Sequence, residues 1–213
     1  REETIYTVLR VSSGSMPHVI LHTAVGCEGV PANIDLAAAE IELVSQPGRE
    51  YCLQEKLTPV LGLYDYVLID CLPSLGLMAI NALRAATGVV IPVQADFLAV
   101  QGLTQILETI GAVRAQLNPG LAIYGVLLTM VDNRKGRAQR VVATVRHSLK
   151  GQVPVFDTEI AQHMALKEAA EAGKSILHYQ GRGAAAEMYR DLAREVARAA
   201  GDLDPRAPHD RGG

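Results

Sequence analysis

The sequence has no tryptophan, and aromatic residues make up only 4% of its 213 residues. Leucine, isoleucine, valine and alanine must therefore fill the core, and a hydrophobic content of 49% is enough for a sizeable one. No apolar run reaches the roughly 18 residues of a membrane span, and there is no signal peptide. These absences argue against a membrane or secreted protein and favour a cytoplasmic location.

Cysteine is also scarce. Cys27, Cys52 and Cys71 are odd in number and form no CxxC pair. A disulfide framework is therefore not expected, and a reducing compartment is the simpler interpretation. The formal net charge of −3 indicates no particular partner for the chain as a whole, so any surface that binds nucleic acid must be local.

Short apolar runs alternate with helical patterns along the chain. Such alternation is typical of an α/β fold, in which a mostly parallel β-sheet is flanked by helices on both faces. We expect one domain over residues 1–200 and a disordered tail over 201–213. The predicted strands are 19–22, 27–31, 66–70, 88–93, 122–130 and 153–160, and the predicted helices are 4–10, 33–44, 49–60, 75–86, 100–117, 137–149, 163–172 and 182–200.

Five segments carry a resemblance to a known family. In their order along the chain they resemble the ParA/Soj partitioning ATPases, P-loop proteins that segregate bacterial chromosomes and plasmids, and the likeness extends from about Thr4 to Arg198. It implies a P-loop NTPase-like fold, ATP or ADP with Mg²⁺, non-specific DNA binding, a ParB-like partner protein, a homodimer and association with the nucleoid. The segments are Pro31–Val44, Tyr64–Gly76, Val90–Gln94, Gln101–Leu103 and Gly125–Met130.

Asp70 ends the apolar run at 66–70, where the family has its Walker B motif. A carboxylate at the end of a strand can reach Mg²⁺ beside nucleotide phosphates, directly or through water. The alternative is an acid that caps the next turn. The residues that follow resemble the switch II loop, although Leu72 stands where the family usually has a second proline. This switch segment comprises Cys71, Leu72, Pro73, Ser74 and Gly76.

The phosphate-binding Walker A loop does not occur in these 213 residues. Such a loop needs a strand, then glycines whose N–H groups wrap the phosphates, then Lys and Ser/Thr at the start of a helix. The one partial match, Gly173-Lys174-Ser175, follows a predicted helix and has Glu168 where glycine is required, so we reject it. The first residue, Arg1, favours a fragment that is incomplete at its N-terminus over a degenerate paralogue. We expect phosphate binding and hydrolysis by this chain to be weak.

Asp132 and Asn133 follow the run at 122–130, where the family places the adenine base. An asparagine amide suits an adenine edge, but Asp-Asn also forms turns readily, and both interpretations stay open. A later loop that contacts nucleotide in the family reads Ile160-Ala-Gln-His163 here instead of Ile-Pro-Arg-Asn.

Residues 133–156 contain no Asp or Glu. A local excess of positive charge suits sequence-independent contacts to DNA phosphates, although a solvated helix face is the simpler alternative. The resemblance supports DNA contact, because Arg134 aligns with a family position known for it. The basic residues are Arg134, Lys135, Arg137, Arg140, Arg146 and Lys150.

Three hypotheses follow. The first is a ParA/Soj-type partitioning ATPase whose P-loop is absent from this chain. The second is a non-catalytic ParA-like adaptor that binds DNA or a partner protein without nucleotide. The third, a MinD-like positioning ATPase at the membrane, ranks low because the tail 201–213 does not read as an amphipathic helix.

Overall fold

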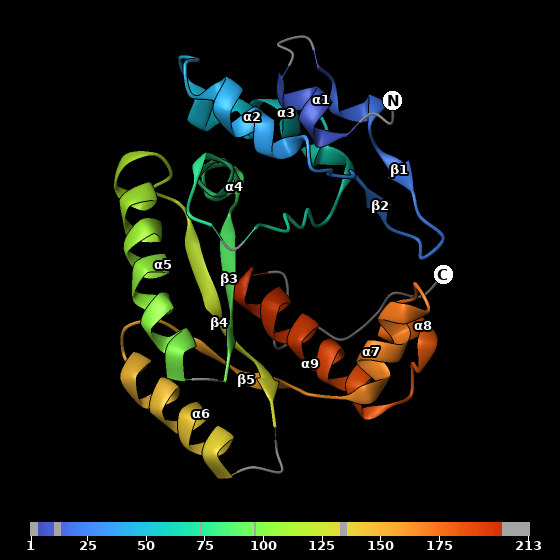
Figure 1. The fold of residues 1–213 in the computed structure, drawn as a ribbon, viewed down its shortest axis with the longest axis vertical. Helices are drawn as coiled ribbons and strands as arrows, with labels where there is room; N and C mark the ends of the chain where they lie inside the picture. Colours follow the sequence, from blue (N-terminus) through green and yellow to red (C-terminus); the bar gives the residue numbers. More distant parts are fainter. Residues whose placement is uncertain (1–3, 11–13, 73, 96, 133–135, 202–213) are drawn as a thin grey trace. The chain divides into compact units, whose positions relative to one another are not determined.

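The computed structural model describes residues 4–10, 14–72, 74–95, 97–132 and 136–201 (Figure 1). Its contacts divide the chain into two compact units. The first comprises Arg1–Thr87 with Glu108–Leu121, and the second comprises Gly88–Leu107 with Ala122–Gly213. Helix α5 (Phe97–Gln116) contributes residues to both. The single domain over residues 1–200 stays a prediction, and the tail from 202 onward lies outside the described residues.

The second unit contains a parallel sheet with the order β3-β4-β5. Its strands are β3 (Gly88–Gln94), β4 (Ala122–Val131) and β5 (Val155–Ala161). They confirm the runs predicted at 88–93, 122–130 and 153–160. Long apolar runs mark these segments because a parallel sheet is covered on both faces.

Helices cover both faces of this sheet (Figure 1). Leu127 of β4 packs in a cluster with Phe156 of β5 and with side chains of α9 (Ala184–Ala199). Val126 and Leu128 are also buried, and they point to the opposite face because side chains alternate along a strand. Helix α6 (Gly136–Leu149) contacts β4 as well. The α/β fold with a helix-covered parallel sheet is therefore confirmed.

Two shorter helices complete the second unit. Helix α7 (Met164–Glu171) and helix α8 (Ile176–Tyr179) contact each other, and α8 also contacts α9. Small side chains, including Ala165 and Ala186, are buried between them. The sequence did not predict α8, because a helix of four residues is too short for a periodic pattern to appear.

Glu195 of α9 binds the middle of β5. Its carboxylate accepts hydrogen bonds from the backbone N–H groups of Asp157 and Thr158, both at 2.8 Å, and from the Thr158 hydroxyl. Partial burial by itself raises the pKa of Glu195. The Thr158 hydroxyl, the two N–H groups and the Arg146 guanidinium outweigh that effect, so the pKa is lowered overall.

We expect Glu195→Gln to destabilise the protein by about 1 kcal/mol at pH 7, because the charged acceptor of these hydrogen bonds is lost. A carboxylate with a lowered folded-state pKa stabilises the fold above its unfolded pKa of about 4.3, and this contribution disappears as the pH falls through the folded value. The variant and the parent should therefore converge in acid. Urea unfolding between pH 7 and pH 3 measures this difference.

The matched control is Glu187→Gln, which makes the same charge change on the same helix. Glu187 is exposed and pairs with Arg190 and Arg194 at the surface, so its loss should change stability much less than the loss of Glu195. Equal effects of the two substitutions at every pH would contradict the role assigned to Glu195.

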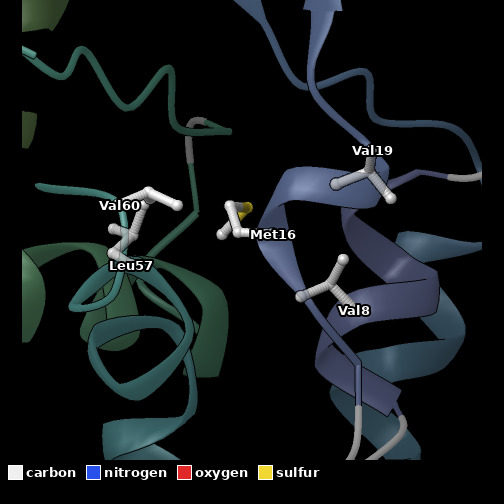
Figure 2. Close-up of a cluster of buried hydrophobic side chains, with 5 residues drawn as sticks. All are labelled: Val8, Met16, Val19, Leu57 and Val60. Atoms are coloured by element: carbon white, nitrogen blue, oxygen red, sulfur yellow. The ribbon is translucent and has the colours of Figure 1, made fainter. Parts of the chain in front are cut away.

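The first unit is built from short helices around an apolar cluster. Figure 2 shows Met16 between Leu57 and Val60 on one side and Val8 and Val19 on the other, and all five are buried. The elements of this unit are α1 (Ile5–Arg10), η1 (Met16–His18), β1 (Leu21–His22), β2 (Glu28–Gly29), α2 (Leu36–Leu43), η2 (Arg49–Tyr51), α3 (Cys52–Leu57), η3 (Leu61–Leu63) and α4 (Leu77–Ala85).

The strands expected at 19–22 and 27–31 are reduced to a hairpin of two residues on each side. Leu21 pairs with Gly29, and His22 pairs with Glu28, in the antiparallel sense. The helices expected at 4–10, 33–44, 49–60 and 75–86 are present in shortened form.

The strand predicted at 66–70 is wrong. Tyr66, Val67 and Leu68 are exposed, Leu68 by 90%, and within the described residues this segment belongs to neither sheet. A segment forms a β-strand only where its backbone N–H and C=O groups make hydrogen bonds with a neighbouring strand. The apolar run is present, but none of the described strands of the first unit lies in register with it.

None of the described helices combines the length and the apolar character needed to cross a membrane.

Candidate functional site

The predicted switch segment leads from Asp70 into helix α4. Asp70, Cys71, Leu72 and Ser74 are exposed, and the Ser74 N–H donates to the Leu72 carbonyl at 2.7 Å. Pro73 lies outside the described residues. The structure thus places the segment at the surface of the first unit, directly before the N-terminus of α4.

Cys71 is not an activated nucleophile. Although the residue is exposed, partial desolvation and then the negative charge of Asp70 raise the pKa of its thiol. The thiol therefore stays protonated at neutral pH, and the thiolate is the reactive form.

Helix α4 is held by two asparagines whose hydrogen bonds the sequence did not predict. Asn81 is buried, accepts from the Leu53 N–H at 3.1 Å and donates to the Arg49 carbonyl at 2.8 Å. At the other end of the helix, the Asn118 amide donates to the carbonyls of Leu83, Arg84 and Ala86. Asn118 thereby satisfies carbonyl groups that a helix C-terminus leaves without partners.

A cavity of about 690 Å³ in the first unit reaches this region. Asp70 and Cys71 line it together with mostly apolar side chains, among them Leu9, Met16 and Leu57. Asp70 fits one part of a magnesium site, because Mg²⁺ takes one or two carboxylates and completes its shell with water and phosphate. Apolar side chains do not bind a polyphosphate, which needs backbone N–H groups and cations.

The described residues therefore fit a magnesium ion in part and do not fit the nucleotide phosphates. Among them, no three His, Cys, Asp or Glu side chains gather closely enough to hold a metal ion by themselves. The partial match at Gly173-Lys174-Ser175 supplies no phosphate loop either. It connects α7 to α8, Gly173 has φ +62° in a turn, and the Ser175 side chain accepts from the His178 N–H.

The carboxyl end of β4 lies beside the later loop. The Gln162 N–H donates to the Val131 carbonyl at 3.0 Å, and its side chain donates to the Met130 carbonyl at 3.3 Å. Met130 has φ 55°, an uncommon conformation for a residue with a side chain. Asp132 follows and is half-buried, whereas Asn133 lies outside the described residues. The structure thus brings together the two loops that the resemblance assigned to the base.

The predicted basic residues differ in their surroundings. Arg140 on α6 and Lys150 after it are exposed. Arg146 pairs with Glu159 of β5 at 3.0 Å and donates to the Asp157 carbonyl, so it already has partners within the second unit. Arg134, Lys135 and the Arg137 side chain lie outside the described residues. Arg140 and Lys150 are therefore the predicted basic residues whose described side chains are exposed.

Comparison with known proteins adds three findings. A family model described as "AAA domain" matches residues 1–123. The chain is 44% identical over 197 residues to the sporulation initiation inhibitor protein Soj of Bacillus subtilis, covering 92% of this chain and 77% of Soj. It is 39% identical over 198 residues to the chromosome partitioning protein ParA of Caulobacter vibrioides, covering 92% of this chain and 73% of that protein.

A solved structure is also similar. Cobyrinic acid a,c-diamide synthase from Mycobacterium smegmatis, with bound ADP and magnesium, superposes with a TM-score of 0.70 at 33% identity and covers 81% of this chain and 74% of that one. Two uncharacterized proteins of Mycobacterium tuberculosis are 43% identical over 196 residues, and the chain spans 61% of their length.

Proposed function

The chain belongs to the ParA/Soj family of partitioning proteins, and we propose that it acts in the segregation of chromosomal or plasmid DNA, which it binds without sequence preference through its basic segment. The observation that carries this proposal is the 44% identity to Soj over 92% of the chain. The exposed side chains of Arg140 and Lys150 supply positive charge for phosphate contacts that carry no sequence information. A homodimer, a ParB-like partner protein and a place at the nucleoid belong to the same proposal.

The proposal includes nucleotide binding, in which Asp70 is the residue assigned to magnesium. The similar synthase structure contains ADP and magnesium, which supports the same ligands for this family. Asp70 would hold Mg²⁺ through water, and such an ion neutralises charge on nucleotide phosphates when it is bound. Asp132 and Asn133 would contact the base. The phosphate contacts themselves are not supplied by the residues that the structure describes.

A non-catalytic adaptor is the second candidate. It is favoured by residues 66–70, which belong to neither described sheet and leave Asp70 without the strand that positions a Walker B acid. Such a protein would bind DNA or a partner without nucleotide.

Calorimetric titration of the purified chain with ATP and Mg²⁺ tests the adaptor candidate. We expect binding weaker than roughly 1 mM, because phosphate-binding groups provide most of the affinity for a nucleotide. The Mycobacterium smegmatis synthase, titrated with ADP and Mg²⁺, is the positive control. Micromolar binding that Asp70→Asn abolishes would contradict this expectation and would exclude the adaptor.

The DNA half of the proposal is tested in parallel. Two duplexes of equal length and unrelated sequence should bind equally well, and their affinity should fall steeply with salt. Absence of DNA binding at low salt, or a strong preference for one duplex, would contradict the proposed function.

A further inference from the structure

The N-terminus of helix α4 is capped from a different helix. The Leu77 N–H donates to Oε1 of Glu40, on α2, at 2.6 Å. The first N–H groups of a helix have no partner within the helix, and the helix dipole favours a carboxylate beside them. Gly76 occupies the N-cap position and has no side chain with which to cap the helix itself. Glu40 therefore performs this task from 37 residues earlier in the chain.

The Glu40 carboxylate also occupies the space that a side chain at residue 76 would need. A Cβ atom at this position would lie 2.0 Å from Oε1 of Glu40, far inside van der Waals contact. The backbone of Gly76, with φ −75° and ψ −170°, is open to any residue. The backbone therefore does not require glycine here. A side chain at residue 76 would instead push aside the flexible end of Glu40 and so remove its carboxylate from the Leu77 N–H.

The pair lies where the switch segment joins the helix. Farther along, Asn81 of α4 bonds to the backbone of Leu53 and Arg49, and Asn118 donates to carbonyl groups at the C-terminal end of α4. Glu40 is the cap closest to residues 71–76. Its position on α2 is set by the buried neighbours Ala39 and Leu43. The carboxylate can therefore hold the end of the segment while the body of α4 is held independently.

We propose that Glu40 is a positioning residue for the switch segment: its carboxylate, in the space left by Gly76, fixes the point at which this segment enters α4 and couples it to α2. The inference rests on the proposed function only in taking residues 71–76 as the nucleotide-responsive segment. The link that Glu40 makes between α2 and the start of α4 does not depend on nucleotide or DNA.

A double-mutant cycle tests the dependence. Glu40→Ala and Gly76→Ala should each accelerate hydrogen exchange at the Leu77 amide by about tenfold or more. The first variant removes the carboxylate that accepts from this amide, and the second displaces it. The double variant should exchange no faster than either single variant, since the alanine at 76 has nothing to displace once Glu40 is gone. Exchange is read by NMR on the whole chain, with the Leu53 amide, held by Asn81, as the internal reference.

Two further variants separate positioning from general stability. Glu40→Gln retains an acceptor oxygen and should keep exchange at Leu77 within about threefold of the parent. Glu42→Ala, on the exposed side of α2, should leave it unchanged. Additive effects in the cycle, or equal acceleration at Leu77 and Leu53, would overturn the proposal. Failure of the parent chain to bind DNA would defeat the proposed function and leave the exchange result standing.

Discussion

Reversing the charge of Arg140 and Lys150 together, to glutamate, should weaken DNA binding at least about tenfold at moderate salt and flatten its salt dependence. Each phosphate contact releases a counterion and contributes a slope of about −0.9 to log K against log salt, so the loss of two contacts should reduce the slope by about 2. Both side chains are exposed on or just after α6. Fluorescence anisotropy with a labelled duplex across a salt series measures affinity and slope together.

The control must change the net charge equally. Lys174→Glu with Arg198→Glu alters two exposed basic residues outside the 133–156 segment and lowers the net charge by the same four units. It should reduce affinity only slightly, through long-range repulsion. Equal losses in the two double variants would show that total charge, and not the basic segment, governs binding.

Replacing Asn81 with alanine should destabilise the first unit by roughly 3 kcal/mol, because each buried polar group left without a partner costs about 1–3 kcal/mol. The side chain is 2% exposed, and it joins α4 to α3 and η2 through the Leu53 N–H and the Arg49 carbonyl. In a protein of this size, such a loss corresponds to a drop in Tm of roughly 6–12 °C. Urea and thermal unfolding, followed by circular dichroism, measure it.

Gln46→Ala removes a similar amide from an exposed position in the same unit and should stay within about 0.5 kcal/mol of the parent. Hydrogen exchange distinguishes the two units, since β4 amides should keep their protection when Asn81 is lost if the second unit is stable by itself. An Asn81→Ala protein as stable as the parent would mean that these hydrogen bonds contribute nothing net.

Much of the fold followed from local sequence. The runs at 88–93 and 122–130 are apolar throughout and bounded by turn residues, and they became β3 and β4 with ends shifted by at most one residue. The helical pattern at 137–149 became α6 with its start shifted by one residue. Such signals are local because burial on both faces of a sheet, or on one face of a helix, is recorded directly in the order of residue types. The motifs that placed the chain in its family are local in the same sense.

Tertiary structure decided what depends on partners distant in sequence. Residues 66–70 have the composition of a strand but belong to neither sheet of the described residues, because hydrogen bonds to a neighbouring strand are a property of two segments. The sequence places Arg146 in a basic run, whereas the structure pairs it with Glu159 at 3.0 Å. The sequence assigned no role to Glu40, and only the fold brings its carboxylate to Gly76 and Leu77. The sequence alone determined the family, the parallel strands and the residue types available. Which carboxylate meets which cation or N–H group was decided by packing, since chain folding brings these groups together from positions 13 and 37 residues apart.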